Sequence, residues 1–203
     1  MSDDHDNKRR RVLKYLTAFF AGVGATVAAI PFVGSLRRPK NLPPPPEMFV
    51  LADITKLKVG QVMPLILNQK LVFILRRPPE AIDFLLQTEI PGLRDPGSLE
   101  SEQPEGLDTP LRSIRSDIFV AYAECTHVGC AVAFSQPMPD RDWYGSDWPG
   151  GHFSCPCHGS VYDTAGRVHK WGPAPKNLGV PYYEFVDENT IRISDIGPDG
   201  LQA

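Results

Sequence analysis

Two short stretches, ECTHVGC at residues 124–130 and SCPCHGS at residues 154–160, decide what this 203-residue chain can build. Together they contain all four cysteines and two of the five histidines. Thiolate and imidazole are the soft ligands that proteins offer to transition metals. Four sulfurs and two imidazoles exceed one tetrahedral site and are too few for two, so the spacing must assign them.

The spacing predicts that each stretch gives one thiolate and one imidazole to a common centre. Cys125 and His127 are two residues apart, so their side chains point to the same side of an extended segment. Cys155 and His158 are three residues apart around Pro156, which lets them converge across a turn. We therefore expect these two cysteines and two histidines to be the metal ligands.

The other two cysteines are predicted to form a disulfide. Side chains alternate along Cys155, Pro156 and Cys157, so Cys157 points away from a centre that Cys155 faces. Cys130 is then free to meet Cys157 and to join the two stretches. Closing that loop would stabilise the fold by ~3 kcal/mol. Such a bond persists only in an oxidising compartment.

The N-terminal residues predict a membrane anchor. The uncharged run from Tyr15 to Leu36 has 22 residues, which at ~1.5 Å each spans the ~30 Å hydrocarbon core. Five Lys and Arg precede this run and three follow it, which favours a cytoplasmic N-terminus. RRRVLK, residues 9–14, resembles a twin-arginine export signal. A cleaved signal peptide is the alternative, but its apolar region is shorter and an Ala-x-Ala site should follow.

The chain therefore divides into four parts. A basic cytoplasmic segment (1–11) and the anchor (12–36) precede a proline-rich hinge (37–47), whose four consecutive prolines favour extended polyproline II. The body covers 48–203 and carries thirteen Lys and Arg against twenty Asp and Glu. This acidic surface argues against nucleic acid as a partner.

The body is predicted to be mostly β. Hairpins are expected at 61–76, around Asn68-Gln69, and at 180–194, around residues 187–189. A further strand at 117–124 leads into the first cysteine stretch, and PPEAIDFLLQ at 78–87 predicts a short helix with prolines at its start. Residues 91–110 are expected to form a long polar loop, either functional or loosely ordered.

CTHVGC and CPCHGS resemble the two motifs of the Rieske iron–sulfur proteins, C-T-H-x-G-C and C-P-C-H-G-S. VYDTAGRV after the second motif, GPAP at 172–175 and the twin-arginine anchor extend the resemblance over nearly the whole chain. The family implies an all-β Rieske-type head of antiparallel sheets, with a small cluster-binding subdomain at about 124–175. It also implies a [2Fe–2S] cluster in which two His replace two Cys on one iron.

The resemblance is greatest to the iron–sulfur subunits of bacterial cytochrome bc1 complexes. It implies that the head takes one electron from ubiquinol and gives it to cytochrome c1, coupled to proton translocation. The partners would be cytochrome b and cytochrome c1 in a dimeric complex of the bacterial inner membrane, with the head in the periplasm. The implied roles are quinol contact and proton acceptance for His158, hydrogen bonds to cluster sulfur from Ser160 and Tyr162, and a shielding proline loop formed by Gly172, Pro173, Ala174 and Pro175.

Other interpretations explain less of the pattern. A Cys2His2 zinc site leaves the second cysteine pair unexplained, and two plain disulfides leave both motif histidines idle. The Rieske subunit of arsenite oxidase is the nearest alternative, whereas Rieske oxygenases and their ferredoxins usually lack the second cysteine pair. The remaining histidines are expected at the surface or hydrogen-bonded, and the tryptophans in packing: His5, His152, His169, Trp143, Trp148 and Trp171.

Overall fold

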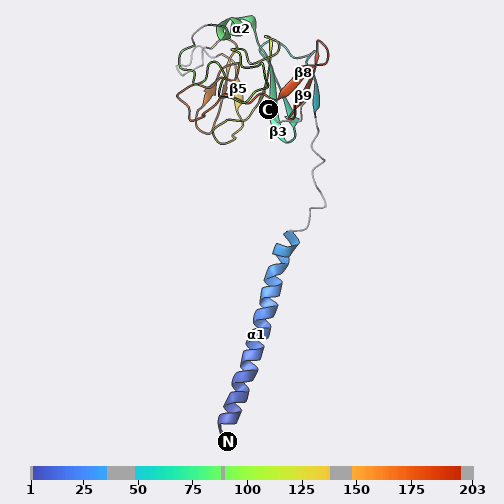
Figure 1. The fold of residues 1–203 in the computed structure, drawn as a ribbon, viewed down its shortest axis with the longest axis vertical. Coiled ribbons are helices and arrows are strands. Elements are labelled where there is room, and N and C mark those ends of the chain that lie inside the picture. Colours follow the sequence, from blue (N-terminus) through green and yellow to red (C-terminus); the bar gives the residue numbers. More distant parts are fainter. Residues whose placement is uncertain (1, 36–48, 88–89, 138–147, 198–203) are drawn as a thin grey trace. The chain divides into compact units, whose positions relative to one another are not determined.

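The computed structural model describes residues 2–35, 49–87, 90–137 and 148–197. The chain forms two compact units, Met1–Pro45 and Pro46–Ala203. Figure 1 shows one long helix in the first unit and a strand-rich body in the second. The body therefore contains both cysteine motifs.

The helix α1 (Ser2–Ser35) contains Pro31 and exposes its apolar side chains, Phe19 and Phe32 among them. Its segment Asn7–Ser35 is long and apolar enough to cross a membrane. This helix agrees with the predicted anchor, although it also includes the basic residues that precede the apolar run. The predicted hinge, residues 37–47, lies outside the described residues.

The described part of the body contains three antiparallel sheets of three strands each. Two of them form the base of the head, and the third carries the cysteine loops. The strands, in sheet order, are β1 (Val50–Asp53), β9 (Thr190–Ser194) and β8 (Tyr182–Phe185); β2 (Val62–Leu67), β3 (Lys70–Arg76) and β4 (Ile118–Tyr122); and β5 (Ala133–Ser135), β6 (His152–Ser154) and β7 (Val161–Tyr162).

Both predicted hairpins are confirmed, and their turns explain them. Asn68 and Gln69 have φ of 47° and 69°, as a two-residue type I′ turn between β2 and β3 requires. Between β8 and β9, the Asp187 carboxylate accepts the N–H groups of Asn189 and Thr190, each at 2.8 Å. The predicted helix is α2 (Pro79–Leu85), which has Pro79 in its first turn.

The core joins the sheet of β5, β6 and β7 to the two sheets of the base. Phe153 of β6 is fully buried, and its ring centroid lies 6.0 Å from that of Phe73 on β3 and 6.3 Å from that of Phe119 on β4. A buried aromatic side chain of this kind contributes about 1.5–3 kcal/mol. Phe153 therefore fixes the second cysteine loop, which begins two residues later, against the body.

Candidate metal centre

The two cysteine motifs fold into loops with the same hydrogen-bond pattern. In each, the first cysteine donates its N–H to the carbonyl five residues on, at 2.8 Å in both loops. The glycine four residues on donates back to the carbonyl of Cys125 at 2.9 Å and of Cys155 at 3.0 Å. Those glycines, Gly129 and Gly159, have φ of 78° and 74°, a conformation that favours glycine. The repeated sequence spacing therefore gives two matching loops.

The four predicted ligands form two pairs, each with one residue from either loop. Cys125 and Cys155 are free thiols that interact with each other, and their residues are 2% and 3% exposed. His127 and His158 are exposed, with ring centroids 4.9 Å apart. The site thus has a buried sulfur side and an exposed imidazole side.

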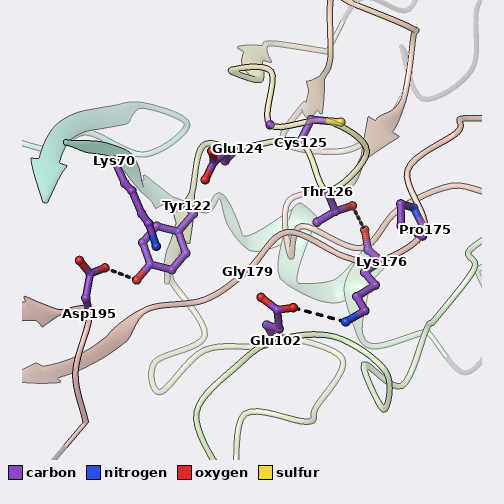
Figure 2. Close-up of a pocket in the computed structure, with 11 residues that line it drawn as sticks. Lys70, Glu102, Tyr122, Glu124, Cys125, Thr126, Pro175, Lys176, Gly179 and Asp195 are labelled. Carbon is purple, nitrogen blue, oxygen red and sulfur yellow. Dashed lines mark hydrogen bonds and ion pairs between the residues drawn. The ribbon is translucent and has the colours of Figure 1, made fainter. Parts of the chain in front are cut away.

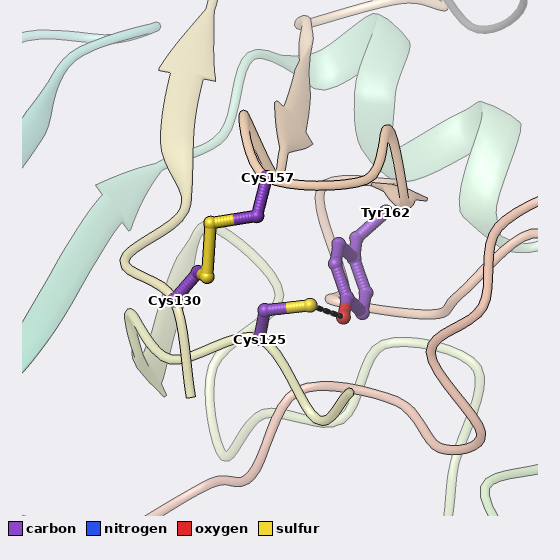
Figure 3. Close-up of a disulfide and its surroundings, with 4 residues drawn as sticks. All are labelled: Cys125, Cys130, Cys157 and Tyr162. Carbon is purple, nitrogen blue, oxygen red and sulfur yellow. Dashed lines mark hydrogen bonds between the residues drawn. A yellow bond between two sulfur atoms is a disulfide. The ribbon is translucent and has the colours of Figure 1, made fainter. Parts of the chain in front are cut away.

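The two loops are joined by a disulfide between Cys130 and Cys157, with Cα atoms 6.6 Å apart (Figure 3). The sulfurs of Cys130, Cys155 and Cys157 lie within 4.8 Å of one another. Because the disulfide uses two of them, only Cys155 among the three offers a free thiol. The structure therefore divides the four cysteines as the spacing predicted.

Tyr162 holds the sulfur of Cys125. Its hydroxyl donates to the Cys125 Sγ at 3.2 Å and accepts the Thr126 N–H at 3.4 Å (Figure 3). Tyr162 is fully buried. Burial and the bond to Cys125 both raise the pKa of Tyr162, so its hydroxyl remains a protonated donor at neutral pH.

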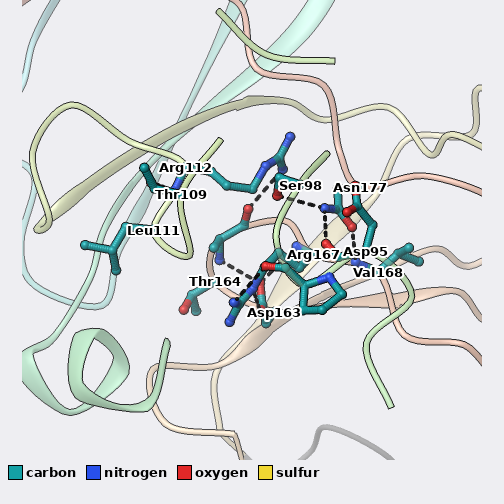
Figure 4. Close-up of polar contacts among 12 residues, drawn as sticks. Asp95, Ser98, Thr109, Leu111, Arg112, Asp163, Thr164, Arg167, Val168 and Asn177 are labelled. Carbon is teal, nitrogen blue, oxygen red and sulfur yellow. Dashed lines mark hydrogen bonds and ion pairs between the residues drawn. The ribbon is translucent and has the colours of Figure 1, made fainter. Parts of the chain in front are cut away.

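The turn after Tyr162 is fixed by a buried ion pair. The Arg167 Nε donates to the Asp163 carboxylate at 2.7 Å, and the same carboxylate accepts the backbone N–H groups of Ala165 and Arg167. Arg112 reaches this turn from another segment and donates to the Ala165 carbonyl at 3.1 Å (Figure 4). These bonds hold residues 163–167 rigidly behind the second loop.

The proline loop, residues 172–175, packs directly on the second motif. A Cβ on Gly172 would lie 2.6 Å from the Ser160 Cα, so only glycine fits. The Ala174 N–H donates to the Ser160 Oγ at 3.2 Å, and Ser160 is fully buried. The Thr126 hydroxyl donates to the Lys176 carbonyl at 2.6 Å. The proline loop is therefore bound to the second cysteine loop, and the residue that follows it is bound to the first.

A recess of about 360 Å³ opens beside Cys125 and Thr126 (Figure 2). Three of its charged side chains have partners within the lining. Lys176 lies 3.3 Å from the Glu102 carboxylate, and the Tyr122 hydroxyl donates to Asp195. No sequence motif marks this recess, because its lining comes from distant segments.

One expectation about other side chains needs correction. Trp171 was expected to be a packing residue, but it is 86% exposed, and its ring lies 6.4 Å from that of His169. His152 and His169 are buried, and His169 is hydrogen-bonded as expected, because its Nδ1 accepts the Trp171 N–H at 3.3 Å. Burial lowers the pKa of His169 to about 4. Trp148 is buried, as expected. Trp143 and the side chain of His5 lie outside the described residues.

Two disulfide-linked loops that present two thiols and two imidazoles define a Rieske iron–sulfur protein. Residues 102–184 match the model of the Rieske [2Fe-2S] domain, and residues 1–38 match the model described as "Ubiquitinol-cytochrome C reductase Fe-S subunit TAT signal". The ubiquinol-cytochrome c reductase iron-sulfur subunit of Allochromatium vinosum is 40% identical over 96% of this chain and 93% of its own. The chain belongs to the family of ubiquinol-cytochrome c reductase iron–sulfur subunits.

A second sequence relative agrees with this assignment. The corresponding subunit of Blastochloris viridis is 35% identical over 95% of this chain and 96% of its own. A solved structure titled hyperthermophilic respiratory complex III aligns with 86% of this chain and 95% of its own at 21% identity, with a TM-score of 0.41. The family assignment itself rests on the sequence relatives.

The comparisons confirm several predictions from the sequence. The Rieske fold, the [2Fe–2S] cofactor and membership of an oxidoreductase complex are correct. The N-terminal match and the apolar helix fit a membrane-anchored protein with twin-arginine export. The arsenite oxidase alternative is not favoured.

Proposed function

We propose that this chain takes one electron from ubiquinol in a respiratory cytochrome bc1 complex and passes it to cytochrome c1. The second electron of the quinol would go to the haems of cytochrome b, which couples the reaction to proton translocation. One observation carries the proposal: the thiols are buried while both imidazoles face solvent. A redox partner can then approach the imidazole side directly.

The donors fit a [2Fe–2S] cluster. Cys125 and Cys155 would hold the inner iron, and His127 and His158 the outer iron, as in the Rieske arrangement. The bound cluster supplies a one-electron redox centre. The remaining cysteines are used by the disulfide, so the ligand set is neither larger nor smaller than this cluster requires.

His158 is proposed to contact the quinol. Its exposed ring would accept the hydrogen bond of a quinol hydroxyl and then its proton. On its inner side, Ser160 would donate to a bridging sulfide and Tyr162 to the Cys125 sulfur. The proline loop, which is bound to Ser160, would keep water from the sulfur side of the site.

The anchor and charge pattern support an orientation. The basic residues before the apolar run would remain in the cytoplasm, and the head would lie in the periplasm beside cytochrome b and cytochrome c1 of a dimeric complex. Residues 37–47 would act as a hinge that lets the head move between these partners. Lengthening this hinge should slow quinol-dependent cytochrome c reduction and leave the cluster spectrum unchanged.

Purification of the native complex tests the function. We expect the chain to co-purify with b-type and c-type haems, to show a Rieske EPR signal, and to lose that signal when quinol oxidation is complete and the cluster reoxidises. Single replacements of the four ligands should abolish the signal, while the control His169→Asn should retain it. A complete complex that turns over quinol without a Rieske signal would refute the proposal.

A further inference from the structure

The polar segment 91–103, which we call the strap, lies along the residues that lead into the proline loop. The Gly92 carbonyl accepts the Lys170 N–H at 2.8 Å, and the Arg94 N–H donates to the Val168 carbonyl at 2.9 Å. Leu93 is thereby paired antiparallel to His169. The strap is not the loosely ordered loop that the sequence left open.

The strap is stiffened from within by Asp95, which is 8% exposed. Its carboxylate accepts the backbone N–H of Leu99 at 2.9 Å, that of Glu100 at 3.1 Å and the Ser101 hydroxyl at 2.7 Å. Burial alone would raise the pKa of Asp95, but these hydrogen bonds outweigh it and lower the pKa. The carboxylate therefore stays ionised and keeps the strap folded.

Asn177 joins the strap to the proline loop, which ends two residues earlier. Its Nδ2 donates to the Asp95 carbonyl at 2.9 Å and to the Ser98 Oγ at 3.0 Å, and its Oδ1 accepts the Val168 N–H at 2.9 Å (Figure 4). Its backbone N–H donates to the Ser101 Oγ at 3.1 Å. Asn177 is 1% exposed, and both polar atoms of its side chain are bonded.

The other end of the proline loop is tied to the same strap. The Arg94 Nη2 lies 3.3 Å from the Lys170 carbonyl and 3.4 Å from the Gly172 carbonyl. Between these two ties, the Ala174 N–H reaches the Ser160 Oγ. The hydroxyl oxygen of Ser160 is thus occupied as an acceptor, and its proton is left to donate in another direction.

We propose that Asn177 is a positioning residue, which fixes the proline loop over Ser160 and so holds the Ser160 hydroxyl ready to donate to the cluster. The strap supplies a rigid surface, and the hydrogen bonds of Asn177 hold the proline loop against that surface. That Asn177 holds the proline loop against the strap is argued from the contacts alone. That the Ser160 hydroxyl then donates to the cluster rests on the proposed function.

Asn177→Asp tests the transmission selectively. The new side chain keeps an acceptor for the Val168 N–H, but it loses the Nδ2 hydrogen bonds to the Asp95 carbonyl and the Ser98 Oγ. In the full-length holoprotein in detergent, we expect the Ala174 amide to exchange with deuterium at least about tenfold faster, which corresponds to ~1.4 kcal/mol of opening free energy. The midpoint potential should fall while the EPR signal persists.

Ile191→Val is the matched control, because it trims a fully buried side chain of β9. It should lower the melting temperature and leave the Ala174 exchange rate and the potential unchanged. If Asn177→Asp lowers the melting temperature but also leaves both quantities unchanged, Asn177 is merely structural and the proposal is wrong.

Arg94→Ala provides a second test should Asn177→Asp fail to fold, because it removes the side-chain ties to the Lys170 and Gly172 carbonyls and leaves the Asn177 contacts in place. It should also accelerate exchange at Ala174, and an unchanged rate would overturn the proposal. A wild-type protein without a Rieske EPR signal would refute the proposed function instead, whereas the exchange result would still decide whether the strap holds the loop.

Discussion

Replacing Tyr162 by Phe should lower the midpoint potential of the cluster by about 60 mV, because ~1.4 kcal/mol corresponds to that shift for one electron. The hydroxyl lies 3.2 Å from the Cys125 Sγ and is fully buried, so water cannot replace it. Hydrogen bonds to charged groups contribute about 1.5–3 kcal/mol, and the bond should be stronger in the more negative, reduced state. The ~1.4 kcal/mol used here as the difference between the two states is about half of the upper value of that range.

Protein-film voltammetry on the purified holoprotein measures this shift, and EPR verifies that the cluster is assembled. Tyr183→Phe is the matched control, because Tyr183 is also buried but its hydroxyl accepts the Ile114 N–H at 2.8 Å. The control should keep the wild-type potential. A wild-type potential in Tyr162→Phe, with an intact EPR signal, would refute the argument that this hydroxyl tunes the cluster.

Three further changes have distinct expected results. Gly92→Ala should lower the free energy of unfolding by about 2 kcal/mol more than Gly106→Ala in denaturant titrations. Both glycines have φ above +80°, but only at Gly92 would the added Cβ overlap a side chain, 1.8 Å from the His169 Nε2. Equal losses in the two variants would contradict this. Because burial lowers the pKa of His169 to about 4, the unfolded chain binds its proton first, so stability should fall as pH drops from ~6.5 to ~4, by up to ~1.4 kcal/mol per unit. His169→Asn should show a smaller fall over this range, and an identical pH profile would disprove the assignment. Replacing both Cys130 and Cys157 by Ser should cost about 3–4 kcal/mol in unfolding free energy, as expected for closing a loop of this length; no loss relative to oxidised wild type would count against this.

The features predicted correctly from the sequence depend on short stretches of chain. The β2–β3 turn was predictable because Asn68 tolerates positive φ and strand residues flank the turn. The cysteine loops were predictable because ligand spacing and the required glycines both lie within seven residues. In each case, the residues that decide the geometry are neighbours in the sequence.

The features that sequence analysis missed depend on contacts between distant segments. Asn177 is an ordinary polar residue in the sequence, and its role appears only when residues 95–101 lie against it. His169 is buried because Gly92, 77 positions earlier, leaves room for its ring. Trp171 was expected to be a packing residue on residue type alone, whereas its position just before the proline loop leaves it exposed to solvent.

The strap also explains why a long polar insertion belongs in this head. β5, β6 and β7 form a sheet of short strands, and β7 has only two residues. The ladder continues outward, because Tyr162 is bridged to Val168 and Leu93 to His169. The strap is therefore the outer edge of the sheet that presents Ser160 and Tyr162. Edge backbone groups exposed to water open readily. Because the strap pairs with the backbone at this edge, it keeps the Ser160 and Tyr162 hydroxyls in place. A long polar segment that looks dispensable in the sequence thus supports the two donors that are expected to set the midpoint potential of the cluster.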